Sequence, residues 1–119
     1  MFAKKLFKQQ GINNIELVNG IFDEAFPMLI STIDAVNFLY VDGNHRKQAT
    51  IDYFEMALTK ADDDSVFVFD DIHWNEEMEE AWDHIRHHSK VRISIDLFFI
   101  GIVFFRSEQK QQEHFDIRY

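Results

Sequence analysis

Apolar residues in the middle of the chain form two runs separated by a helical pattern. The runs Ala35 to Val41 and Ser65 to Phe69 are nearly continuous, as is typical of strands buried on both faces of a parallel sheet. Between them, residues 45–61 place apolar side chains at helical spacing. Strand, helix and strand in this order predict a parallel α/β unit.

The segments before this unit carry weaker patterns. Residues 2–10 predict a short helix that ends at Gly11, which tolerates a positive φ. Residues 15–18 predict a short strand, and residues 22–30 a short helix whose regularity Pro27 limits. These segments extend the alternation of helices and strands towards the amino terminus.

A clearly amphipathic helix follows the second apolar run. Asn75 suits its N-cap, and Glu76 and Glu77 suit the positive end of its dipole. The apolar stripe that we expect to enter the core consists of Trp74, Met78, Ala81, Trp82 and Ile85.

The carboxy-terminal third predicts strands alone. Residues 91–97 alternate, with Ser94 and Asp96 on the polar face, and residues 100–106 are close enough to pair with them as an antiparallel hairpin. A last short strand is expected within residues 114–119. We therefore predict one α/β domain over residues 1–119, with a mainly parallel sheet, an antiparallel carboxy-terminal hairpin and helices on both faces.

Charge and cysteine content narrow the class of protein. A net charge of −9 repels phosphate backbones and argues against a nucleic-acid partner. The sequence has no cysteine, which excludes a structural disulfide and fits a reducing setting. The longest uncharged apolar stretch, residues 97–105, is far shorter than the roughly 20 residues of a membrane helix. We expect a soluble, cytoplasmic domain without a membrane partner.

Polar side chains follow both predicted parallel strands. Asp42 and His45 come after the first strand, and Asp70, Asp71 and His73 come after the second. Ligands of open α/β sheets bind beyond the carboxyl ends of the strands, and adjacent strands lie about 4.8 Å apart. Three carboxylates at one point favour a hard cation such as Mg²⁺ or Ca²⁺, and the two imidazoles would also admit Mn²⁺ or Zn²⁺.

Other interpretations of these residues stay open. Aspartates and asparagines at strand ends commonly form turns or cap the next helix, and Asn44 fits that role. His84, His87 and His88 have a spacing that can build a metal site, although histidines at a helix end more often face water. The glycines are too widely spaced to form a phosphate-binding loop.

Three segments together resemble class I S-adenosylmethionine-dependent methyltransferases. Residues 38–45 read FLYVDGNH, residues 66–74 read VFVFDDIHW, and residues 95–105 read IDLFFIGIVFF. They are similar to the fourth strand with its Asp-Gly-x-His ending, the fifth strand with its Asp-Asp ending, and the closing hairpin of that fold. With residues 15–24, which resemble the third strand and its turn, the resemblance covers the carboxy-terminal half of the fold.

The resemblance also implies roles for the strand-end residues. Asp42, Asp70 and Asp71 match the Mg²⁺ ligands of the metal-dependent branch related to catechol O-methyltransferases. Such an ion would orient a hydroxyl of a small-molecule acceptor and lower its pKa for attack on the methyl sulfonium. His45 and His73 would serve as a base or as substrate contacts.

The resemblance covers the cofactor-binding residues of the family less completely. Gly20, Ile21 and Phe22 match the loop that touches the adenine of S-adenosylmethionine, with Ile21 where an acidic residue is common. The first two strands, the glycine-rich loop and the ribose-binding acid of the family would precede Phe2, so we expect a truncated fold that is impaired as an isolated chain.

Two functions follow from this expectation. One is a methyltransferase fragment that acts on a small acceptor, and the other is a non-catalytic oligomerisation or binding module. Without its usual neighbours, the strand at Ala35 to Val41 would expose an apolar edge. We expect residues 15–18 or a second copy of the chain to cover that edge, the latter giving a homodimer or a larger oligomer.

Overall fold

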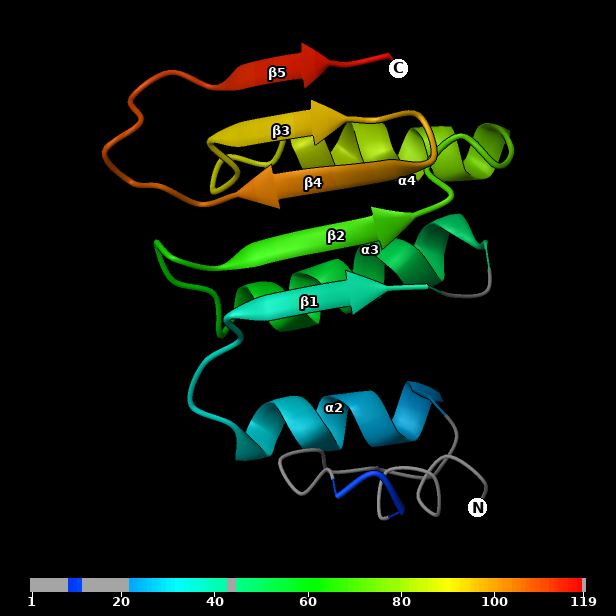
Figure 1. Cartoon of the computed structure of the whole chain (residues 1–119), viewed down its shortest axis with the longest axis vertical. Helices are drawn as coiled ribbons and strands as arrows, with labels where there is room; N and C mark the ends of the chain where they lie inside the picture. Colours follow the sequence, from blue (N-terminus) through cyan, green and yellow to red (C-terminus); the bar gives the residue numbers. More distant parts are fainter. Residues whose placement is uncertain (1–8, 12–21, 43–44, 119) are drawn as a thin grey trace.

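The strands form one open sheet with the order β1-β2-β4-β3-β5 (Figure 1). A computed structural model describes residues 9–11, 22–42 and 45–118. β1 and β2 run parallel, β4 lies antiparallel between β2 and β3, and β5 runs parallel to β3. The bounds are β1 Phe38–Val41, β2 Val66–Asp70, β3 Ile93–Asp96, β4 Ile100–Phe104 and β5 Glu113–Asp116.

This topology confirms the α/β class, the parallel pair and the antiparallel hairpin. The hairpin folds back so that β4, its second strand, pairs with β2. β2 therefore lies between two strands, and Phe67 and Phe69 on its inner face are almost completely buried. Aromatic and β-branched residues suit such a position because they pack well on a pleated surface.

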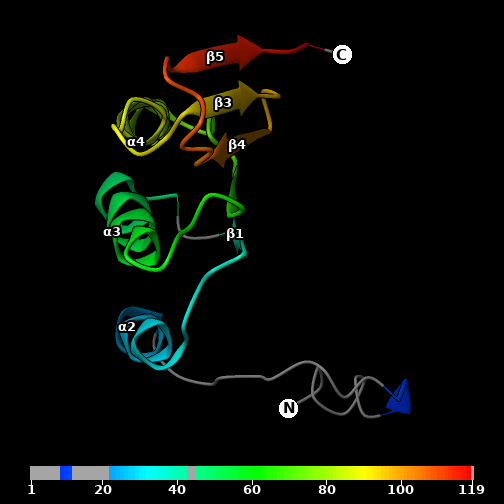
Figure 2. The same ribbon diagram turned by 90° about the vertical axis from the view of Figure 1, so that its left-hand side faces the viewer.

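Three helices lie on the same side of the sheet (Figure 2). They are α2 Phe22–Thr32, α3 Lys47–Leu58 and α4 Glu76–Arg86. The helices were expected on both faces, and in the described residues they cover only one. Phe54 of α3 fills the layer between them and the sheet, with its ring 6.3 Å from that of Phe67 and 6.1 Å from that of Phe69.

The other face of the sheet presents apolar side chains to solvent. Successive residues of a strand point to opposite faces, so Leu39 and Val41 pack against the core while Phe38 and Tyr40 point away from it. Phe38 is 64% exposed and Tyr40 is 50% exposed. Phe115 on β5 is 46% exposed.

The amphipathic helix α4 forms largely as its sequence predicts. The Asn75 side chain accepts a hydrogen bond of 2.8 Å from the Met78 backbone N–H, and such a cap contributes about 1 kcal/mol. Met78, Ala81, Trp82 and Ile85 are buried. Trp74 is 63% exposed, so its predicted place in the core is wrong.

Gly101 allows α4 to pack closely on β4. A Cβ atom at this position would lie 2.5 Å from the indole ring of Trp82, so close that the ring or the strand would have to shift. The ring of Trp82 therefore lies directly over the backbone of β4.

The expected strand at 15–18 and most of the expected helix at 2–10 lie outside the described residues. Gly11, where that helix was expected to end, has a φ of 71°. No helix in the described part of the chain is long and apolar enough to cross a membrane.

Candidate active site at the carboxyl ends of the parallel strands

Three aspartates meet where β1 and β2 end. The parallel register pairs Val41 with Phe69, so the residues that follow, Asp42 and Asp70, emerge side by side. One carboxylate oxygen from each of Asp42, Asp70 and Asp71 lies within 4.8 Å of the other two. We call these three residues the carboxylate cluster. The predicted convergence of the strand ends is confirmed in the geometry.

The carboxylate cluster is electrostatically costly without a cation. Burial, followed by the negative charges of Asp71 and Asp42, raises the pKa of Asp70. The Asp71 backbone N–H donates to Asp70 Oδ1 at 3.0 Å, which opposes the rise without cancelling it. A bound cation would favour the ionised form of all three groups.

His45 is tied to the carboxylate cluster through Asp71. Its Nε2 lies 2.9 Å from Asp71 Oδ2, so Nε2–H donates to that carboxylate and Nδ1 is the nitrogen that can accept a proton. The imidazole also stacks on Trp74, with ring centroids 4.4 Å apart and an angle of 16° between the ring planes. Asp71 and Trp74 together fix the orientation of His45.

Left-handed backbone gathers at this edge. In the described residues, the non-glycine residues with positive φ are His45 at 55°, Asp71 at 56° and Phe98 at 73°. They belong to the loops that follow β1, β2 and β3. The Asp71 N–H donates to the Phe99 carbonyl at 2.7 Å and joins the second loop to the third. Strained backbone of this kind is concentrated at functional sites.

His73 points to a different set of partners. Its Nδ1 lies 2.7 Å from Glu79 Oε2, and its Nε2 lies 2.7 Å from Asp96 Oδ2. Both nitrogens must therefore donate, which makes the ring an imidazolium. Burial acts against that charge, but Glu79 and Asp96 outweigh it and raise the pKa of His73. His73 is thus bound between two carboxylates and has no nitrogen left to accept a proton.

Asp96 was not foreseen as part of this region. The alternation along residues 91–97 placed Ser94 and Asp96 on a polar face, yet they are only 2% and 7% exposed. Each has a histidine partner instead: the Ser94 hydroxyl lies 2.6 Å from His114 Nδ1, and Asp96 binds His73. The sequence signal for their burial was a pair of polar residues two positions apart in an otherwise apolar strand. Their partners come from distant segments of the chain.

The His73–Asp96 ion pair should give stability its own pH window. Burial raises the pKa of Asp96, but the Phe98 N–H, His73 and Arg118 together lower it. The carboxylate contributes stability above its ordinary pKa and loses it as the pH falls through the lowered value. His73 contributes below its ordinary pKa and loses that contribution as the pH rises through the raised value.

We expect the contribution of the pair to be greatest between about pH 4 and about pH 6.5, the ordinary carboxyl and imidazole values. Urea unfolding across this range should show that Asp96→Asn costs most inside the window. An Asp96→Asn penalty that does not vary with pH would contradict the ion pair.

The remaining candidate residues are placed less fully. Gly20 and Ile21 lie outside the described residues, and Phe22 is the first residue of α2, with its side chain also outside them. Among the described side chains, the carboxylate cluster is the one group of three that could hold a metal ion. His84 and His88 face Glu55 instead, and His87 faces Asp83.

Comparison with known proteins identifies the family. A family model described as a methyltransferase domain matches residues 2–72, more than half of the chain. No curated protein and no solved structure matches the chain. The matched range includes β1, β2 and the whole carboxylate cluster. The chain belongs to the methyltransferase domain family.

Proposed function

We propose that this chain serves S-adenosylmethionine-dependent methyl transfer to a hydroxyl of a small-molecule acceptor, with a divalent ion held by the carboxylate cluster. The observation that carries the proposal is the convergence of Asp42, Asp70 and Asp71 at the carboxyl ends of two parallel strands in a methyltransferase domain. Ligands of open α/β sheets bind at this edge.

The donor set fits a hard cation. Three carboxylates offer only oxygen atoms, the ligand type that Mg²⁺ prefers, and Mg²⁺ usually keeps several waters besides one or two carboxylates. Asp42 is exposed, while Asp70 and Asp71 are half-buried, which leaves one side of the cluster open to an acceptor. Burial and the charges of Asp71 and Asp42 raise the pKa of Asp70, and a cation at the cluster would offset that repulsion. Bound there, the ion would supply Lewis acidity that lowers the pKa of an acceptor hydroxyl.

The proton of that hydroxyl has a defined destination. With its Nε2–H held by Asp71, His45 presents Nδ1 as the basic nitrogen. We assign His45 the role of accepting the proton while the acceptor oxygen forms a bond to the methyl carbon. The methyl donor, when bound, would supply the methyl group and keep the electron pair of its carbon–sulfur bond on the sulfur. Asp71 keeps the tautomer and stabilises the imidazolium that forms. His73, with both nitrogens engaged, would position the neighbouring loops rather than act as a base.

Calorimetry with Mg²⁺ and then S-adenosylmethionine tests this function. We expect Mg²⁺ to bind the wild-type chain and S-adenosylmethionine to release further heat when Mg²⁺ is present. His45→Gln keeps a side-chain N–H for Asp71, so it should lower the Mg²⁺ affinity less than loss of an aspartate of the carboxylate cluster would. If neither ligand binds the wild-type chain, the proposed function is wrong.

A second candidate function is self-association through β1. In the described residues, no strand pairs with the outer edge of β1, and Phe38 and Tyr40 beside that edge are exposed. Unpaired strand edges with apolar side chains favour pairing with another chain. A second copy would place the same two side chains on the same face, so that both sheets continue as one.

Sedimentation tests this candidate. We expect the wild-type chain to sediment as a dimer, and Phe38→Lys to return it to a monomer because a charged residue at a strand edge opposes pairing with another chain. Phe115→Lys, on β5 at the opposite edge of the sheet, is the matched control and should remain dimeric. A wild-type chain that is monomeric at all concentrations would exclude self-association.

A further inference from the structure

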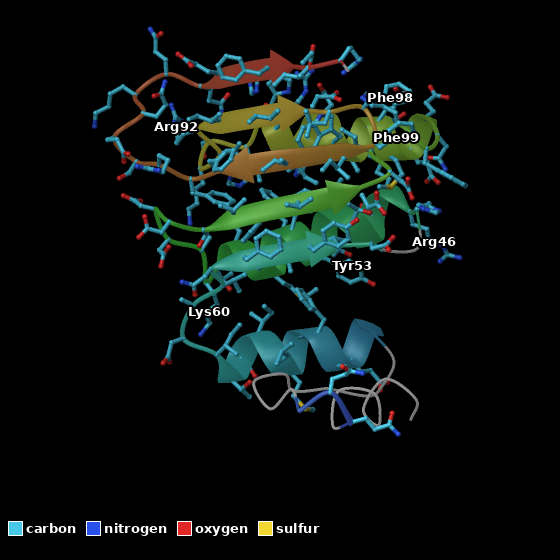
Figure 3. The ribbon with its side chains drawn as sticks, in the orientation of Figure 1. Arg46, Tyr53, Lys60, Arg92, Phe98 and Phe99 are labelled. Carbon is cyan, nitrogen blue, oxygen red and sulfur yellow. The ribbon has the colours of Figure 1, made fainter. Side chains whose placement is uncertain are left out.

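A cavity lies where β2 and β3 begin and β4 ends, whereas the carboxylate cluster lies where β1 and β2 end. Its volume is about 520 Å³, within the range of pockets that hold small organic ligands. Figure 3 shows Arg92, which lines the cavity, on the side of the molecule opposite to Phe98 and Phe99. The cavity shares no residue with the carboxylate cluster and is therefore a separate candidate site.

Basic side chains outnumber acidic ones in the lining of this cavity. Lys90, Arg92 and Lys110 line it, together with the acidic residues Asp62 and Asp63. The chain as a whole has the opposite balance, with 12 lysines and arginines against 21 aspartates and glutamates. Among the described residues, no ion pair joins any of the three cations to a carboxylate. The cavity therefore gathers positive charge in an acidic protein.

Arg92 fixes the two loops that carry the lysines. Its Nε–H donates to the Gln109 carbonyl at 3.0 Å, and its Nη2 donates to the Lys110 carbonyl at 2.8 Å. Its Nη1 donates to the Ser89 carbonyl, also at 2.8 Å. Three of the five guanidinium N–H groups are thus engaged, and all three partners are uncharged. Because Arg92 is half-buried, its charge has lost part of its water without gaining a counter-ion.

The two aspartates of the lining are bound to donors other than the three cations. Asp63 Oδ2 accepts a hydrogen bond from the Ser107 hydroxyl. Asp62 Oδ1 accepts one from the Asp64 backbone N–H at 3.0 Å. The guanidinium and the two ammonium groups therefore remain available to an anion from solution.

We propose that this cavity binds a small organic anion, whose phosphate or carboxylate group lies beside Arg92 and the two lysines. Arg92 has two N–H groups left for such a group, and both lysines can add charge-assisted hydrogen bonds. The apolar side chains of Ala61 and Phe105 also line the cavity, which favours an anion that carries a carbon framework. This site is distinct from the one assigned to methyl transfer, and neither depends on the other.

Four anions and one neutral compound are suitable probes, with binding measured by NMR on the full chain at constant ionic strength. Benzoate and benzamide have similar shapes and differ in charge, and phenyl phosphate offers the other acidic group. We expect benzoate or phenyl phosphate to bind at least about 3-fold more tightly than benzamide, and the tighter anion identifies the acidic group. Acetate and inorganic phosphate, which lack the ring, should bind more weakly than their aromatic counterparts.

The same spectra locate the bound anion. The Arg92 Nε–H is held by the Gln109 carbonyl, so its signal should be observable and should shift on binding. Arg118 contacts the Phe98 ring on the opposite side of the molecule, and its Nε–H signal should not shift.

Substitutions of the lysines then test the contacts. Lys90→Gln and Lys110→Gln each remove one charge and keep a long polar side chain. Each should weaken binding of the tighter anion by about 2-fold to 5-fold, as expected for an exposed charged contact. Arg92 is left in place because it fixes both loops. Lys60→Gln is the matched control: Figure 3 shows Lys60 away from Arg92, and it does not line the cavity, so binding should be unchanged.

Two results would overturn the anion site. One is that neither aromatic anion binds more tightly than benzamide. The other is an equal loss of affinity in Lys60→Gln, Lys90→Gln and Lys110→Gln, which would reflect net charge alone. Acetate or inorganic phosphate binding as tightly as its aromatic counterpart would contradict the carbon framework of the ligand.

Discussion

Replacing Asp70 with asparagine should lower the affinity of the chain for Mg²⁺ by at least about 100-fold. Substitution of groups that merely support metal ligands typically costs 10-fold to 100-fold, and Asp70 would be a ligand itself. Asparagine keeps the shape and one oxygen but removes the charge. Asp70 is the natural choice because burial and its two acidic neighbours already raise its pKa. Isothermal titration of Mg²⁺ into both proteins measures the change.

The same substitution should not destabilise the fold. An aspartate with a raised pKa weakens the folded state once the pH exceeds its ordinary value, because the folded protein then holds an unfavourable charge. Asp70→Asn should therefore unfold at an equal or higher urea concentration at neutral pH. Asp116→Asn, on the exposed strand β5, is the control and should leave Mg²⁺ affinity unchanged. An Asp70→Asn protein with wild-type Mg²⁺ affinity would remove Asp70 from the proposed site.

Phe54→Ala should destabilise the chain by about 3–5 kcal/mol, the usual cost of emptying a buried aromatic position. Phe54 has no exposed surface, and its ring contacts Phe67 and Phe69 of β2. It also meets the imidazole of His88 at 5.5 Å, beyond the end of α4. Removing the ring leaves a cavity that touches α3, β2 and the segment after α4. Urea unfolding followed by circular dichroism measures the loss.

Since domains are typically stable by about 5–15 kcal/mol, the Phe54→Ala protein should be close to unfolding at room temperature. Phe115→Ala makes the same chemical change at a half-exposed site and should cost about 0.5 kcal/mol or less. A Phe54→Ala loss as small as that of Phe115→Ala would show that α3 does not pack on the sheet as described.

Much of the fold follows from local patterns. Continuous apolar runs identified β1 and β2, and their order with α3 implied a parallel pair. The alternation over residues 91–97 and the closeness of the next run identified the hairpin of β3 and β4. Helices on both faces were expected because α/β sheets are usually covered twice, yet the pattern of one helix does not encode which side of a sheet it will occupy.

The polar faces were less predictable. Ser94 and Asp96 alternate with apolar residues and so indicated a solvent-facing side of β3, but the structure buries them. Their burial depends on His114 and His73, which lie far away in sequence and reach them only after folding. The prediction for Trp74 was wrong in the opposite direction, because the residue was expected in the core and is exposed. Its spacing matched the core stripe of α4, but it precedes the N-cap and stacks on His45.

The candidate site was predictable where geometry alone decides it. Neighbouring parallel strands end at the same edge of a sheet. Asp42, Asp70 and Asp71 must therefore lie close together once β1 and β2 pair in register. The engagement of His73 was not predictable, because Asp96 arrives from the end of β3 and Glu79 from α4. The stacking of Trp74 on His45 was not predictable either, because the two residues follow different strands.

Paramagnetic Mn²⁺ offers the most direct test of the carboxylate cluster as a cation site. Mn²⁺ takes the same oxygen ligands as Mg²⁺ and broadens the NMR signals of nearby nuclei. At a few per cent of the protein concentration, it should broaden the amide signals of Asp42, Asp70 and Asp71 first, and excess Mg²⁺ should restore them. Broadening that begins at His84, His87 and His88, or that spreads evenly over the acidic surface, would contradict the account.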